Sequence, residues 1–134
     1  MNFEIKNGEK VRTVLAVKGS STVIPAGSLV AIDDGLIIPA VATSAAVAYA
    51  PNGAGNGETT VEITIGNDFT LVGTADENFT VAKKGSTCDI TDAQLIDIGA
   101  TSKNVLLVSP SVTAGTVGSK NNVEVKINKP LFWE

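Results

Sequence analysis

The sequence predicts an all-β fold, built as a single small β-sandwich or β-barrel domain. Short runs rich in Thr, Val and Ile recur along the chain, separated by glycine-containing turn signals at a spacing of about 8–12 residues. Segments with the 3.6-residue apolar period of a helix are almost absent. The 134 residues suit one domain, because a chain of this length buries about two thirds of its unfolded surface.

The first strand is expected over Val11–Val17, and a hairpin follows it. Ser28–Ile32 and Leu36–Ile38 are apolar runs joined by residues 33–35, which read Asp-Asp-Gly. An Asp-Gly pair supplies the positive φ angles that tight hairpin turns require. The sequence therefore predicts two antiparallel strands with a short turn between them.

The middle of the chain continues with strands and a loop. Ala45–Ala50 is a strand of small residues, and Pro51–Gly57 is a loop with two Asn-Gly pairs. Glu58–Ile65 has the clearest alternation of apolar and polar residues, which predicts a strand with one buried face. The face expected to be buried carries Val61, Ile63 and Ile65, and the opposite face carries Thr60, Glu62 and Thr64.

The second half of the chain predicts further strands and at most one or two helical turns. The helical candidate is Asp89–Ile98, where Thr91 or Asp92 could cap a turn, although the segment is short and β-branched. The expected strands are Phe69–Val72, Phe79–Ala82, Cys88–Ile90, Asn104–Ser109 and Asn122–Asn128.

The two ends of the chain differ from its middle. Residues 1–18 are expected to form an extended N-terminal arm and the first strand, and residues 19–134 the β domain. The first ten residues are polar and weakly patterned, so the arm is expected to contact a partner without belonging to the core. The last five residues hold two of the six aromatics, Phe132 and Trp133. These either close the chain's own core or anchor in a neighbouring subunit.

Charge is distributed unevenly along the sequence. The net charge is −4, but residues 19–82 contain no Lys or Arg and seven acidic residues, so the remaining segments sum to +3. Because nucleic-acid binding needs a basic stripe, no nucleic-acid partner is expected, whereas a cationic protein surface is compatible. No apolar run approaches the roughly 18 residues of a membrane span, so no membrane contact is expected. No secretory signal is visible, which predicts synthesis in a cytoplasm.

Composition also argues against an enzyme. The chain has no histidine and one cysteine, which removes the commonest general base and most metal-ligand sets. The carboxylate pairs lack the spacing of a calcium loop, and the glycines of residues 53–57 are followed by a strand pattern rather than a helix. Cys88 follows Lys83 and Lys84, but a buried core thiol beside an exposed turn is favoured over a nucleophile. We therefore expect no cofactor and no metal.

Three segments carry a resemblance to a known family. They are Val23–Pro39 (VIPAGSLVAIDDGLIIP), Lys84–Ser102 and Val123–Phe132. In order and spacing they resemble the head decoration, or capsid cement, proteins of tailed bacteriophages. In that family an early hairpin after a Pro-Ala-Gly stretch is followed by Ala/Gly-rich strands.

The resemblance implies a β-tulip-like domain without enzymatic activity, located on the outer capsid surface of a virion. It implies binding to the major capsid protein of an assembled head, clamping of adjacent capsomers, and a homotrimer. The small-residue segment Ala40–Ala50 fits such self-association. The alternative is a small β-sandwich fibre or adhesin domain that binds a receptor or glycan. Partner contacts are expected from the arm and the tail, at Phe3, Ile5, Lys6, Lys10, Arg12, Phe132 and Trp133.

Overall fold

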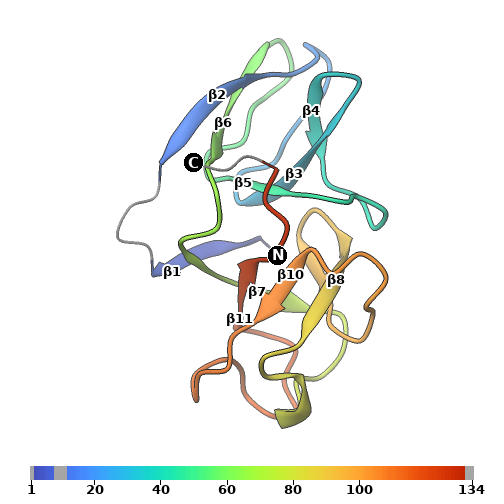
Figure 1. The fold of residues 1–134 in the computed structure, drawn as a ribbon. Coiled ribbons are helices and arrows are strands. Elements are labelled where there is room, and N and C mark those ends of the chain that lie inside the picture. Colours follow the sequence, from blue (N-terminus) through green and yellow to red (C-terminus); the bar gives the residue numbers. More distant parts are fainter. Residues whose placement is uncertain (1, 8–11, 132–134) are drawn as a thin grey trace.

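The computed structural model describes residues 2–7 and 12–131 and confirms the all-β prediction (Figure 1). Among the described residues one short 3-10 helix, η1 (Val81–Lys83), is present, and no helix has the length and apolar character needed to cross a membrane. The strands are β1 (Glu4–Asn7), β2 (Thr13–Val17), β3 (Ser28–Asp33), β4 (Leu36–Pro39), β5 (Ala48–Ala50), β6 (Thr60–Thr64), β7 (Thr70–Ala75), β8 (Thr87–Asp92), β9 (Leu95–Asp97), β10 (Leu106–Val108) and β11 (Val123–Ile127).

Five strands close a barrel in the lower half of Figure 1. The neighbours run antiparallel in the order β7, β11, β10, β8 and β9, and β9 returns to β7 in a parallel pairing at Thr74 and Ala75. Strand β1 pairs antiparallel with the first half of β7, at residues 70–72. The sixth strand of this sheet is therefore the N-terminal segment of the chain.

The upper half contains two smaller sheets, β4-β3-β5 and β2-β6. The predicted hairpin is confirmed, since β3 and β4 pair antiparallel from Asp33–Leu36 outward. Its turn residues, Asp34 and Gly35, have φ angles of 54° and 81°. Two consecutive positive φ angles define the type I′ turn that the Asp-Gly pair predicts.

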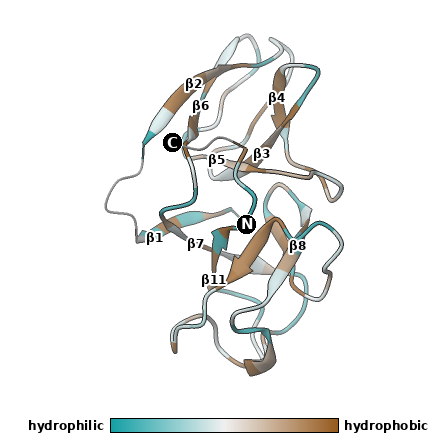
Figure 2. Cartoon of the chain, viewed as in Figure 1, coloured by the Kyte–Doolittle hydropathy of each residue, from teal (hydrophilic) through white to brown (hydrophobic). Residues whose placement is uncertain are grey.

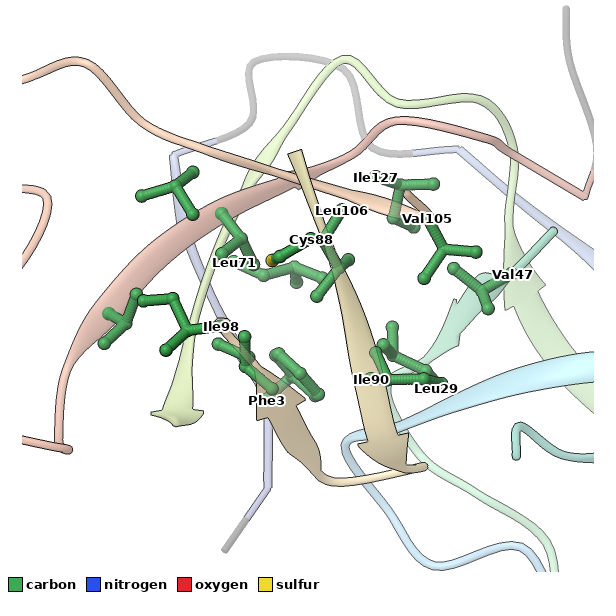
Figure 3. Packing of buried hydrophobic residues seen from close by; sticks show 14 of the residues in the cluster. Phe3, Leu29, Val47, Leu71, Cys88, Ile90, Ile98, Val105, Leu106 and Ile127 are labelled. Atoms are coloured by element: carbon green, nitrogen blue, oxygen red, sulfur yellow. The ribbon is translucent and has the colours of Figure 1, made fainter. Parts of the chain in front are cut away.

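Two apolar cores lie on opposite faces of β3, so the two halves share a strand. Leu29 and Ala31 belong to the core of the barrel, and Val30 belongs to the core of the upper half. Alternate residues of a strand face opposite sides, which explains why β3 is buried on both faces. Figure 3 shows the barrel core, where Leu29 lies beside Ile90 of β8.

Three local expectations are wrong. Asp89–Ile98 forms the β8–β9 hairpin instead of a helical turn, because Ile90 and Ile96 pair across it and are both buried. Phe79–Ala82 is not a strand: the buried Phe79 precedes η1. Thr64 is buried rather than exposed, because its hydroxyl accepts a hydrogen bond of 3.0 Å from the Tyr49 N–H.

Residues 2–7 do not form a free arm, and Phe3 is not an exposed anchor for a partner. The Phe3 side chain is 0% exposed and lies in the barrel core (Figure 3). Its N–H donates to the Gly27 carbonyl at 2.8 Å, and its carbonyl accepts from the Tyr49 hydroxyl at 2.7 Å. A Cβ at Gly73 would lie 2.5 Å from the Phe3 ring, so this glycine provides the space that the ring fills. The N-terminal segment therefore belongs to the core.

We predict that Phe3→Ala destabilises the protein by about 3–5 kcal/mol, because truncation of a buried Phe removes apolar contacts and leaves a cavity. Urea denaturation followed by circular dichroism measures the free energy of unfolding. Ile5→Ala, on the adjoining strand β1, is the control, and it should cost about 1 kcal/mol or less because Ile5 is 37% exposed. Equal stability of Phe3→Ala and the parent protein would contradict the burial of this side chain.

Candidate functional site

The structure places two of the predicted partner residues together. Ile5 and Lys6 are neighbours on β1 and both side chains are exposed. Arg12 is also exposed, but it precedes β2 and its carbonyl accepts a hydrogen bond of 2.8 Å from the Ile65 N–H. The other predicted residues besides the buried Phe3 lie outside the described part of the chain: Lys10, Phe132 and Trp133.

A shallow trough follows β1 on the surface of the six-stranded sheet. It consists of two adjoining hollows of about 390 Å³ and about 370 Å³, which share Glu4, Val72 and Asn122. We call this surface the β1 trough. The first hollow also contains Ile5, Lys6, Thr113 and Glu124, and the second also contains Asn2, Gly73, Thr74 and Asn121.

An ion pair fixes the shape of the trough. The Lys6 ammonium donates to the Glu124 carboxylate and, at 3.3 Å, to the Thr113 hydroxyl. Glu124 is only 5% exposed, and it lies on β11, which is separated from β1 by β7. Val72 of β7 is paired with Glu4 on one side and Glu124 on the other. The pair therefore spans three strands and neutralises a nearly buried carboxylate.

The chemistry of the trough suits contact with another protein. Its hollows are lined by amide, hydroxyl and carboxylate groups around the apolar side chains of Ile5 and Val72, a mixture compatible with the polar rim of a protein interface. Within residues 2–7 and 12–131, no three His, Cys, Asp or Glu side chains are placed to hold a metal ion.

Sequence reasoning missed half of the trough. Val72, Asn122 and Glu124 lie far from β1 in sequence, and only the pairing of β1 with β7 and of β7 with β11 brings them to it. The available signal was Glu124, a carboxylate between Val123 and Val125 in an otherwise apolar run. A charge between two buried valines requires a partner, but the sequence does not identify Lys6 as that partner.

A separate hollow, of about 470 Å³, lies on the upper half of the molecule. Ile32, Ile38 and Val41 line it, together with small residues of the loop before β5. The segment Ala40–Ala50 was expected to form a surface for self-association. Its first part is largely exposed at this hollow, whereas residues 47–50 are buried. Only part of that segment can therefore contact a partner.

The thiol of Cys88 is a core group, as the sequence favoured. Its exposed fraction is 0%, and burial, followed by repulsion from Asp89, raises its pKa to about 12. The carboxylate of Asp89 accepts hydrogen bonds from the backbone N–H groups of Lys103 and Asn104, both at 2.8 Å. A neutral buried thiol next to a carboxylate that caps a loop has a structural role.

Comparisons with protein-family models, with curated proteins and with solved structures found no match to this chain.

We predict that Asp97→Asn stabilises the protein at pH 7 and has no effect at about pH 2. Desolvation and then repulsion by Asp76 raise the pKa of Asp97 above its ordinary value. The native state therefore binds more protons than the unfolded state, and stability falls as pH rises through the unfolded and then the folded pKa. An asparagine cannot ionise, so the variant avoids this loss.

Thermal unfolding across this pH range tests the prediction, with the solvent-exposed Asp68→Asn as the control. The melting temperature of Asp97→Asn should exceed that of the parent only above the ordinary aspartate pKa of about 4. An increase of the same size at low pH would show that ionisation of Asp97 is not its cause.

Proposed function

We propose that this protein is a head decoration protein of a tailed bacteriophage, which binds the outside of the assembled head and clamps adjacent capsomers. The observation that carries the proposal is the segment Val23–Pro39, which resembles the early hairpin of that family after its Pro-Ala-Gly stretch. In the structure this segment forms the β3–β4 hairpin and the residues that lead into it, where the Gly27 carbonyl accepts a hydrogen bond from the Phe3 N–H. One residue of the segment, Gly27, thus helps to hold Phe3 at the start of the N-terminal strand.

The proposed mechanism requires no chemistry at a reacting bond. A cement protein binds only the assembled lattice of the major capsid protein, so its binding free energy stabilises that state. Contacts repeated over many identical sites add to this effect. A homotrimer on the outer capsid surface would let each protomer make the same contact with a different capsid subunit.

The β1 trough is the surface that we assign to the capsid contact. It contains Ile5 and Lys6, two of the predicted partner residues that are exposed in the described part of the chain. Its walls are strands of one hydrogen-bonded sheet, and the Lys6–Glu124 pair holds β1 in place before a partner arrives. A preformed surface loses less conformational entropy on binding than a disordered arm would.

Sedimentation with phage heads tests the proposal. The probe is the undecorated head assembled from the major capsid protein of the genome that encodes this chain. We expect the full chain to sediment with heads at a saturating ratio, whereas unassembled capsid protein should not retain it. Failure to bind heads, together with binding to defined sugars on a glycan array, would instead support the fibre or adhesin alternative.

We predict that Ile5→Asp weakens head binding at least tenfold, which corresponds to about 1.4 kcal/mol. A carboxylate at this position adds charge to a trough that already contains Glu4 and Glu124. Val23→Asp is the matched control, since Val23 is 54% exposed and does not line the trough. The melting temperature of each variant checks folding. Equal binding by Ile5→Asp and the parent would move the capsid contact away from the β1 trough.

A further inference from the structure

The loop of residues 51–57 connects β5 to β6 in the upper half of the molecule and contains two Asn-Gly pairs (Figure 1). The pairs are Asn52–Gly53 and Asn56–Gly57, and both asparagines are exposed. An asparagine loses its side-chain amide readily before glycine, because glycine has no Cβ to hinder attack by its backbone nitrogen. The attack requires a nitrogen that can approach the asparagine Cγ. The two pairs differ in this requirement.

The backbone nitrogen of Gly57 is held in a hydrogen-bonded turn. Its N–H donates to the Ser20 carbonyl at 2.6 Å. The Glu58 N–H donates to the Gly55 carbonyl at 3.3 Å, and the Glu58 carboxylate accepts from the Gly55 N–H at 3.0 Å. Attack by the Gly57 nitrogen on Asn56 must first break the bond to Ser20, which requires local opening of the turn. The fold therefore protects Asn56.

The backbone nitrogen of Gly53 has no hydrogen-bond partner among residues 2–7 and 12–131. The next residue, Ala54, makes both of its main-chain bonds to Ile24, each at 2.8 Å. The amide of Asn52 donates to the Glu62 carboxylate at 3.3 Å, which is longer than the usual range of about 2.7–3.2 Å. This contact restrains the amide weakly, so Asn52 has both an accessible amide and an unbonded nitrogen beside it.

We propose that Asn52 is a site of spontaneous deamidation in the folded protein, and that the fold protects Asn56. The Gly53 nitrogen forms a bond to the Asn52 Cγ, and the Cγ–Nδ2 bond breaks. The proton of the Gly53 N–H passes through water to the leaving amide, which departs as ammonia. Water then opens the resulting succinimide ring. Cleavage of the bond to Cγ gives aspartate, and cleavage of the bond to the main-chain carbonyl carbon gives isoaspartate. The inference does not depend on the proposed function.

The product carries a carboxylate where the parent protein has an amide donor. Because the Asn52 amide donates to Glu62, hydrolysis replaces a donor–acceptor contact with two facing acceptors of like charge. Residues 19–82 contain no Lys or Arg, so this segment supplies no cation to compensate for the added charge. We therefore expect the reaction to weaken the contact between the loop and β6.

Peptide mapping of the full chain by mass spectrometry tests the site. Freshly purified protein is incubated at mildly alkaline pH, which promotes loss of the glycine N–H proton, and fragmentation follows each asparagine separately. This also separates both sites from Asn7, whose following glycine lies outside the described residues. We expect Asn52 to convert at least tenfold faster than Asn56 in the folded protein. In urea the two should convert at similar rates, because each precedes glycine in the unfolded chain.

Two results would overturn the proposal. One is conversion of Asn56 as fast as that of Asn52 in the folded protein, and the other is the absence of conversion at Asn52. A difference of the same size in urea would show that the local sequence causes it and would equally exclude protection by the fold.

Glu58→Ala tests the protection of Asn56 directly. The variant removes the side-chain bond to the Gly55 N–H and so loosens the turn. We expect conversion of Asn56 to rise at least threefold while that of Asn52 stays unchanged. Asp34→Ala, at an exposed acid of a different turn, is the control. The melting temperature of each variant checks folding, and an unchanged rate at Asn56 would contradict protection by this turn.

The effect of the product is tested with Asn52→Asp, and Asn56→Asp is the matched control. We expect a lower melting temperature for Asn52→Asp, because the parent residue donates a hydrogen bond to the Glu62 carboxylate and the aspartate cannot. An equal or higher melting temperature of Asn52→Asp would contradict the predicted weakening of the contact between the loop and β6.

Discussion

The burial of Phe3 is the contact on which the arrangement of the molecule depends. Its ring fills the space beside Gly73 in the barrel. Its backbone makes hydrogen bonds to the carbonyl of Gly27 and the hydroxyl of Tyr49, both in the upper half. One residue near the N-terminus therefore joins elements from both halves of the fold. The same contact places β1 along β7, and without β1 there would be neither a Lys6–Glu124 pair nor a β1 trough. The burial of Phe3 therefore contributes both to the packing of the core and to the position of the candidate site.

The acidic bias of residues 19–82 persists at the surface of the upper half. Asp33, Asp34 and Glu58 are exposed there. Lys18 is the basic residue just before this acidic stretch. Its side chain is buried, and its ammonium donates hydrogen bonds to two backbone carbonyls. The structure therefore uses this lysine to close a loop, and it does not neutralise the acidic surface. Such a surface is compatible with a cationic protein partner, for which charge complementarity would act mainly through orientation and association rate.

Features set by local chemistry were predictable from the sequence, and features set by distant contacts were not. The β3–β4 hairpin follows from Asp34-Gly35, and the buried positions Val61 and Ile63 follow from strict alternation. The destination of Phe3 was not predictable, because Gly73 becomes its neighbour only when β1 pairs with β7. The parallel β7–β9 pairing that closes the barrel likewise has no local signal. At the candidate site, the sequence identified Ile5 and Lys6 but not the opposite wall.

The two N-terminal strands differ in chemistry, and this difference assigns them different contacts. Strand β1 is charged, irregular and hydrophilic in Figure 2, so it resists strand addition while offering polar groups to a partner across the β1 trough. Strand β2 is uncharged and pairs with β6 in unbroken register, and β4 borders its end through the Lys18–Ile37 bridge, so these main-chain contacts lie within the fold.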